Sequence, residues 1–157
     1  MRIRESMRIR KRVLPALLAA ALLLILTACG GSKSYADGTY EGISGDEAAL
    51  DWEDQAGGDG YGAATVTIEG GVITGCTFAI FEPDGTQKDA EYGKSGGQIT
   101  SQDYYNKAQR AVLACDRYAE ELVRTGSPDK VDAVSGATIC YEQFQDAVRA
   151  ALDAASS

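Results

Sequence analysis

The sequence predicts an α+β fold: a small antiparallel sheet with two amphipathic helices packed against it. Two runs rich in β-branched and aromatic residues, 63–68 and 72–81, are separated by Glu69-Gly70-Gly71, which is typical of a tight hairpin. Two later stretches, 101–126 and 141–155, carry apolar residues at spacings of three and four. That period indicates helices that each bury one face.

The first 28 residues have the pattern of a secretory signal. A basic start is followed by an apolar run from Val13 to Leu26, shorter than the ~20 residues that a membrane-spanning helix needs. The segment Leu26-Thr27-Ala28-Cys29 resembles the lipobox of bacterial lipoproteins. The resemblance implies cleavage before Cys29 and diacylglyceryl attachment to it. The alternatives are a transmembrane anchor and an ordinary signal with an incidental cysteine.

The remainder of the chain divides into a tether and one folded domain. Gly30-Gly31-Ser32-Lys33-Ser34 is typical of a flexible linker. We therefore predict a signal peptide at residues 1–28, a lipidated cysteine with its tether at 29–36, and one domain at 37–157. Because the first four residues recur from Met7 onward, Met7 is an alternative start that leaves a complete signal.

Charge and residue types exclude several classes of protein. The first 28 residues hold six of the 15 basic and one of the 23 acidic residues, so nine basic and 22 acidic residues remain, a net charge of −13. Such a surface repels nucleic acid and anionic lipid headgroups. The chain has no histidine, which excludes histidine-ligated haem, histidine-containing zinc sites and histidine-dependent catalytic triads.

Cysteine spacing gives no sign of a metal site, because the chain contains no Cys-x-x-Cys pair. If Cys29 is lipidated, three cysteines remain and at most one internal disulfide can form. Cys76 and Cys115 fall on apolar faces and are predicted to be small buried residues.

The domain is predicted to open with a short strand that includes Tyr40 and Ile43, after a turn at Asp37-Gly38. Residues 45–60 are acidic and glycine-rich and are predicted to form a loop. Trp52 within them is interpreted as an aromatic that covers the core, with a stacking surface for a ligand as the alternative.

In the hairpin, one face of each strand is predicted to point into the core. The predicted inward residues are Val66, Ile68, Val72, Cys76 and Phe78. The stretch that follows, 82–97, is predicted to be turn and loop, and it contains Tyr92 and Lys94. We interpret these two as loop residues, with contact to a bound ligand as the alternative.

Ser101 is predicted to cap the first helix, and Gly126-Ser127-Pro128 to end it. The three arginines that recur at spacings of seven are predicted to form a solvated stripe; they are Arg110, Arg117 and Arg124. The predicted apolar face of this helix is Ala108, Val112, Cys115, Ala119 and Leu122. That of the last helix is Phe144, Ala147, Val148, Ala151 and Leu152.

The segment between the helices, Asp132-Ala133-Val134-Ser135-Gly136-Ala137-Thr138, is small and polar. Ser135 and Thr138 offer hydroxyls, and Gly136 lets a ligand approach the backbone closely. Thr138 is predicted to lie in the first turn of the last helix, where free N–H groups favour an anion such as phosphate. We expect the stretch from Ser135 to Thr138 to lie on the surface. The alternative is that Ser135 is simply the N-cap of that helix.

This segment resembles the flavin-attachment motif of the FMN-binding domain family. The family includes the FMN-carrying subunits of the sodium-pumping NADH:quinone oxidoreductase and of the Rnf complex, and many short bacterial lipoproteins. Its pattern is Asp, a small residue, any residue, Ser or Thr, Gly, Ala, Thr, and every fixed position matches. The resemblance implies that an FAD-dependent flavin transferase joins FMN to Thr138 through a phosphoester. It makes Asp132, Ser135, Gly136 and Ala137 the other cofactor-binding residues.

The resemblance covers nearly the whole domain and departs from the family just beyond the acceptor. Two residues after Thr138 the family often has Ser or Thr, and this chain has Cys140. The implied function is that of a lipid-anchored, extracytoplasmic flavoprotein that relays electrons between a donor and an acceptor at the membrane, with no catalytic residue of its own. The alternatives are non-covalent FMN binding by the same fold, and a flavin-free surface lipoprotein that acts as an interaction module.

Overall fold

The computed structural model describes residues 34–45 and 59–156. The predictions for the signal peptide, for Cys29 and for Trp52 fall outside these ranges. None of the helices within them has the length and apolar character needed to cross a membrane. The elements, in chain order, are β1 (Gly38–Ile43), β2 (Tyr61–Glu69), β3 (Val72–Phe81), α2 (Gln102–Thr125), the 3₁₀ turn η2 (Pro128–Lys130) and α3 (Thr138–Ala155).

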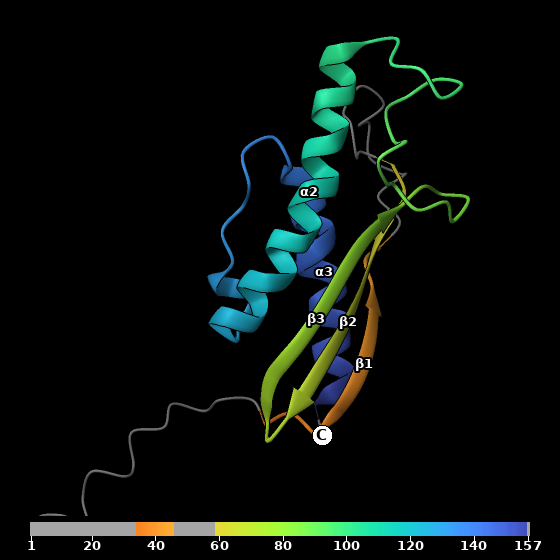
Figure 1. Cartoon of the computed structure of the whole chain (residues 1–157). Coiled ribbons are helices and arrows are strands. Elements are labelled where there is room, and N and C mark those ends of the chain that lie inside the picture. The colour runs from red at the N-terminus through yellow and green to blue at the C-terminus, as the bar shows by residue number, and fades with distance from the viewer. Residues whose placement is uncertain (1–33, 46–58, 157) are drawn as a thin grey trace, which may run out of the picture. The chain divides into compact units, whose positions relative to one another are not determined.

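The three strands form one antiparallel sheet in the order β1-β2-β3, and both helices pack on the same face of it (Figure 1). Helix α2 lies over β3, while α3 lies over β1 and β2. The α+β prediction is therefore confirmed, including the antiparallel sheet and the two helices packed against it. The core is the layer between sheet and helices.

The hairpin forms at the predicted turn, but a β-bulge changes which residues face inward near it. Phe78 is buried as predicted, whereas Val72 is 60% exposed and Cys76 is half-buried. The register places Thr67 opposite Gly75 and Ile68 opposite Ile73, so Thr74 is an extra residue on β3. An extra residue reverses the alternation of faces beyond it. For this reason Ile73 replaces Val72 in the core.

Helix α2 begins and ends where the sequence predicts. The backbone N–H of Tyr104 donates to Oγ of Ser101 (3.4 Å), and the N–H of Gly126 donates to the carbonyl of Leu122 (2.8 Å). Its buried face includes four of the five predicted residues, and the fifth, Val112, is half-buried. The complete buried face is Ala108, Ala111, Ala114, Cys115, Tyr118, Ala119 and Leu122.

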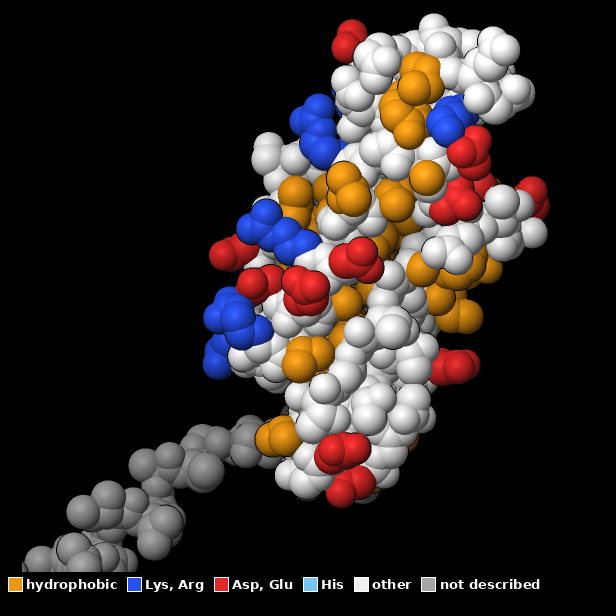
Figure 2. Space-filling view, in the orientation of Figure 1, with side chains coloured by type: hydrophobic (Ala, Val, Ile, Leu, Met, Phe, Trp, Pro, Cys, Tyr) orange, Lys and Arg blue, Asp and Glu red, His pale blue; other side chains and the backbone are white. Residues whose placement is uncertain are grey.

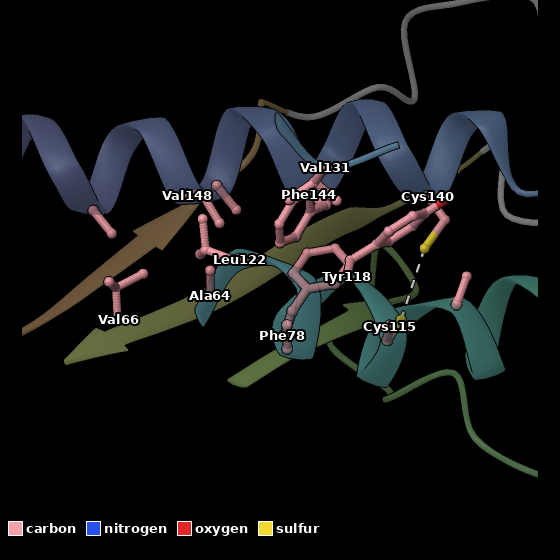
Figure 3. Packing of buried hydrophobic residues seen from close by; sticks show 14 of the residues in the cluster. Ala64, Val66, Phe78, Cys115, Tyr118, Leu122, Val131, Cys140, Phe144 and Val148 are labelled. Carbon is pink, nitrogen blue, oxygen red and sulfur yellow. Dashed lines mark hydrogen bonds between the residues drawn. The ribbon is translucent and has the colours of Figure 1, made fainter. Parts of the chain in front are cut away.

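Helix α3 buries all five residues predicted for its apolar face. Phe144 is the centre of this packing, since its ring meets Phe78 edge-on (5.3 Å between centroids) and stacks on Tyr118 (5.3 Å). Figure 3 shows these rings between α3 and the sheet. The backbone of α3 approaches β1 so closely that a Cβ at Gly42 would overlap the carbonyl oxygen of Ala147.

The stretch between β3 and α2 is irregular, as predicted, and packs against itself and α2. Nζ of Lys94 forms an ion pair with Glu91 (2.7 Å) and lies 5.7 Å from the centre of the Tyr105 ring. Lys88 is buried, with its Nζ 4.9 Å from the centre of the Tyr92 ring. These contacts agree with the interpretation of Tyr92 and Lys94 as loop residues.

Candidate functional site

The segment 132–138 leaves η2, runs back alongside α2 and leads into α3 (Figure 1). Near its start lies the end of α2, where Arg124 pairs with Glu121. The hydrogen bond that the Arg124 guanidinium donates to the Glu121 carboxylate raises the pKa of Arg124, and the carboxylate of Asp132 adds a smaller effect in the same direction. Asp132 itself is exposed and, in the described part of the chain, makes no hydrogen bond. Other groups therefore hold the segment in place.

The core of the segment is a β-turn from Val134 to Ala137. The N–H of Ala137 donates to the carbonyl of Val134 (3.0 Å), and Gly136, at the third position of the turn, has φ of 79°. This combination is that of a type II turn, which favours glycine at that position. A methyl group on Gly136 would also lie 3.3 Å from Nη1 of Arg110. The backbone conformation favours glycine here, whereas the flexible Arg110 side chain could move to make room for a methyl group.

One buried hydroxyl group holds both ends of this turn. Oη of Tyr118, from the middle of α2, accepts the N–H of Val134 (2.9 Å) and donates to the carbonyl of Ala137 (3.3 Å). The Tyr118 ring is fully buried. Tyr141, in the first turns of α3, adds a further contact by donating its hydroxyl to the carbonyl of Val131 (2.9 Å). Two tyrosine hydroxyls therefore fix the path of the segment against the helices.

Burial raises the pKa of Tyr118 to about 12, and the N–H of Val134 opposes this with a smaller lowering effect. The hydroxyl is neutral, and able to donate to Ala137, through the whole physiological range. Because the folded pKa lies above the ordinary value near 10, the stabilisation from Tyr118 is present below about pH 10. It is lost as the pH rises from there toward 12.

Thr138 is the first residue of α3, and its side chain is exposed. Ser135 and Gly136 are exposed as well, so the expectation of a surface segment is right for these three. It is wrong for Ala137, which is only 3% exposed because it packs in the hydrophobic core. Its carbonyl accepts hydrogen bonds from Tyr118 and from the α3 backbone. The buried alanine anchors the turn, while its neighbours remain accessible.

The beginning of α3 has no side-chain cap. Its N-cap residue is Ala137, which offers no acceptor, and Ser135 lies in the preceding turn. The alternative interpretation of Ser135 as the N-cap is therefore wrong. The N–H groups of the first helical turn remain available to an anion, beside the Thr138 hydroxyl.

A positive charge lies next to this helix start. The Arg110 side chain lies against Gly136, and within the described residues it forms no ion pair or hydrogen bond. The basic side chains of α2 gather along one edge of that helix (Figure 2). Arg110, Arg117 and Arg124 are all exposed, so the prediction of a solvated arginine stripe is confirmed. Arg124 pairs with Glu121, and Arg110 in addition lies against Gly136.

The fold and this turn define a small α+β module with an exposed hydroxyl at a helix start that suits phosphate. Two solved structures are similar. CPE2226 protein from Clostridium perfringens is 20% identical with a TM-score of 0.54, over 77% of this chain and 88% of that one. An NMR structure of a protein from Clostridium thermocellum is 22% identical with a TM-score of 0.41, over 77% and 92% of the two chains. The first likeness confirms the fold alone.

The family model of the FMN-binding domain matches residues 55–153 of this chain. The chain belongs to this family, and it is an FMN-binding flavoprotein. No curated protein matches it. The resemblance drawn from the attachment motif is thus confirmed, and so is FMN as the cofactor.

The residues present fit the phosphate end of FMN. Thr138 supplies a hydroxyl, the start of α3 supplies free N–H groups, and Arg110 supplies a cation beside Gly136. Sequence reasoning missed Arg110 and Tyr118. For Tyr118 a signal existed, because it lies three residues after Cys115 and four before Leu122 on the apolar face. For Arg110 none existed, because its spacing is equally typical of a solvated surface.

We predict that Tyr118→Phe lowers the free energy of unfolding by about 1–3 kcal/mol, the usual cost of a buried donor left without its partner. The ring packing on Phe144 is kept, but the N–H of Val134 loses its acceptor. Urea unfolding followed by circular dichroism measures the change. Tyr104→Phe, on the same helix but exposed, is the control and should change it by less than about 0.5 kcal/mol. Equal effects of the two substitutions would contradict the role given to Tyr118.

Proposed function

We propose that this protein carries FMN covalently on Thr138 and works as an electron-relay module on the outer side of the cytoplasmic membrane, held there by a lipid on Cys29. The observation that carries the proposal is the exposed Thr138 hydroxyl at the uncapped start of α3. It lies in a turn that matches the attachment motif of the family to which the chain belongs.

The attachment reaction requires a partner enzyme, an FAD-dependent flavin transferase. The Thr138 hydroxyl oxygen forms a bond to the phosphorus nearest the riboflavin part of FAD, and the pyrophosphate bond breaks. AMP leaves, and the hydroxyl proton passes to a base of the transferase or to water. Exposure of Thr138, Ser135 and Gly136 supports this step, because a second protein must reach the hydroxyl.

The chain's own groups hold the attached phosphate. Arg110 lies against Gly136, two residues before the uncapped start of α3, so its guanidinium and the first-turn N–H groups are the donors that we assign to the phosphate. Hydrogen bonds to a charged phosphate are stronger than those between neutral groups. Asp132 is exposed, so its carboxylate is open to the transferase.

Bound FMN supplies one- and two-electron transfer through its isoalloxazine ring. The polypeptide holds the FMN in position and keeps it at the membrane, and we assign it no catalytic residue. The redox partners are a donor and an acceptor at the membrane. The lipobox-like segment before Cys29 and the net charge of −13 beyond residue 28 support anchoring through acyl chains rather than through a basic surface.

We predict that Thr138→Ala abolishes covalent flavin and changes the free energy of unfolding by less than about 0.5 kcal/mol, because the hydroxyl is exposed. In-gel flavin fluorescence of denatured protein, produced together with a flavin transferase, is the measurement. Thr138→Ser should retain part of the signal, and Thr100→Ala, an exposed threonine outside the site, should retain all of it. Fluorescence that persists in Thr138→Ala would refute attachment there. Flavin that co-purifies but is lost on denaturation would favour non-covalent binding.

We predict that Arg110→Gln slows flavin attachment about tenfold at limiting transferase, the value expected for one charge-assisted hydrogen bond. Arg117→Gln, one stripe position further along α2, is the matched control and should leave the rate unchanged. Initial rates of covalent fluorescence measure both. Equal rates for the two variants would show that Arg110 does not contact the phosphate, without bearing on Thr138 as the acceptor.

We predict that Cys29→Ser gives an unprocessed or released protein without lipid. The measurement is labelling with radioactive fatty acid, followed by salt washing of the membranes. The parent protein should keep its label and stay with the membrane, and Cys76→Ser serves as the control for a general effect of losing a cysteine. A Cys29→Ser variant that is still labelled and membrane-bound would overturn the lipobox interpretation.

A further inference from the structure

Two cysteine thiols meet between α2 and the start of α3. Sγ of Cys115, in α2, lies 3.7 Å from Sγ of Cys140, in the first turn of α3 (Figure 3). Both side chains are buried, and both residues are free cysteines here. Cys115 is buried, as the sequence predicts, but its thiol also contacts a second thiol, which the sequence did not predict.

Both thiols are also directed to the same acceptor. Cys115 donates to the carbonyl of Ala111 (3.5 Å) and Cys140 donates to the same oxygen (3.4 Å). That carbonyl lies within α2, where the helical N–H of Cys115 also reaches it. Removal of both thiol protons would therefore leave no buried carbonyl without a donor.

We propose that Cys115 and Cys140 form a disulfide that joins α2 to the start of α3. Disulfide sulfurs lie about 2.0 Å apart, so the two Sγ atoms need to approach by about 1.7 Å from their present separation. Rotation of the two side chains, with a small shift of the start of α3, supplies a movement of that size. The proposal rests on this geometry and does not require that Thr138 carry FMN.

The reaction is a thiol–disulfide exchange. The two cysteines each lose one electron and one proton as the Sγ–Sγ bond forms. A disulfide-bonded donor, such as oxidised glutathione, loses its own S–S bond and leaves as two thiols. The hydrogen bond with Cys115, together with burial, raises the pKa of Cys140, so its reactive thiolate is scarce in the folded protein. The bond is therefore expected to form while the chain folds, before the helices close over the sulfurs.

The position of the bond gives it a specific effect. The ring closed between residues 115 and 140 contains Tyr118, η2 and the entire segment from Asp132 to Thr138. A disulfide across this ring restricts the unfolded chain and holds the start of α3 against α2. It does not supply any atom of the flavin linkage, which is made by oxygen. Oxidation therefore stabilises the attachment turn without being needed for attachment.

The test uses the full chain, purified in detergent and refolded from denaturant with either reduced or mixed reduced and oxidised glutathione. After alkylation of the remaining thiols, peptide mass spectrometry should find Cys115 joined to Cys140, two hydrogen atoms lighter than the reduced pair, with Cys76 alkylated. The melting temperature should be about 10 °C higher in the oxidised form, from the loop-closure entropy of a ring of this length.

Variants separate the pair from general effects of oxidation. Cys115→Ala and Cys140→Ala should each remove the difference in melting temperature between the two refolding conditions, while Cys76→Ala should keep it. The comparison within each variant remains valid even where the substitution itself lowers stability. Full alkylation of both cysteines after oxidative refolding, a disulfide that uses Cys76 or Cys29 instead, or an oxidised form that is no more stable than the reduced one would overturn the proposal.

Discussion

The hydroxyl of Tyr118 is the contact on which the site depends. It is buried under the turn, accepts one backbone N–H and donates to one backbone carbonyl, three residues apart along the chain. A connecting segment normally follows the surface with its polar groups in water. Here the turn is fixed to α2 from below, because an unpartnered polar group in that position would cost free energy. The upper side of the turn is thereby left open to solvent and to other molecules.

This constraint explains why the start of α3 is an unusual helix terminus. Most helices begin with a side chain that caps their first N–H groups. In α3 the cap position is occupied by Ala137, whose small side chain is buried and whose carbonyl is held by Tyr118. An alanine there costs helix stability, but it leaves the donors free for a phosphate. The same backbone geometry presents Thr138 outward as the next residue.

The charge next to the turn also favours an anion. Beyond residue 28 the chain is strongly acidic, yet the side chain against Gly136 is that of Arg110. Among the described residues Arg110 has no acidic partner, and such a cation in an acidic protein gives a local preference for an anion. Glycine suits position 136 because its φ is positive, and the Arg110 side chain lies against it. The motif therefore encodes the turn.

The sequence by itself determined the elements and the position of Thr138 at a helix start. Hairpin spacing, the Ser101 cap, the Gly126 stop and two apolar periodicities are local signals, and they predicted β2, β3, α2 and α3 close to their observed bounds. The turn at Asp37-Gly38 predicted the existence of β1. The attachment motif is also local, so Thr138 at a helix start could be read directly. Those local signals fail where a single inserted residue changes the alternation of faces, as at Thr74, which moved Val72 out of the core.

Only the tertiary structure decided which distant residues serve the turn. Tyr118, Arg110 and Cys115 come from α2, and their partners Val134, Gly136 and Cys140 come 16 to 26 residues later. No spacing rule connects them, because their proximity arises from the return of the chain along α2 before α3 begins. An arginine at a seven-residue spacing and a tyrosine on an apolar face each have several possible environments. The packing of α3 beside α2 on one sheet face selects among them.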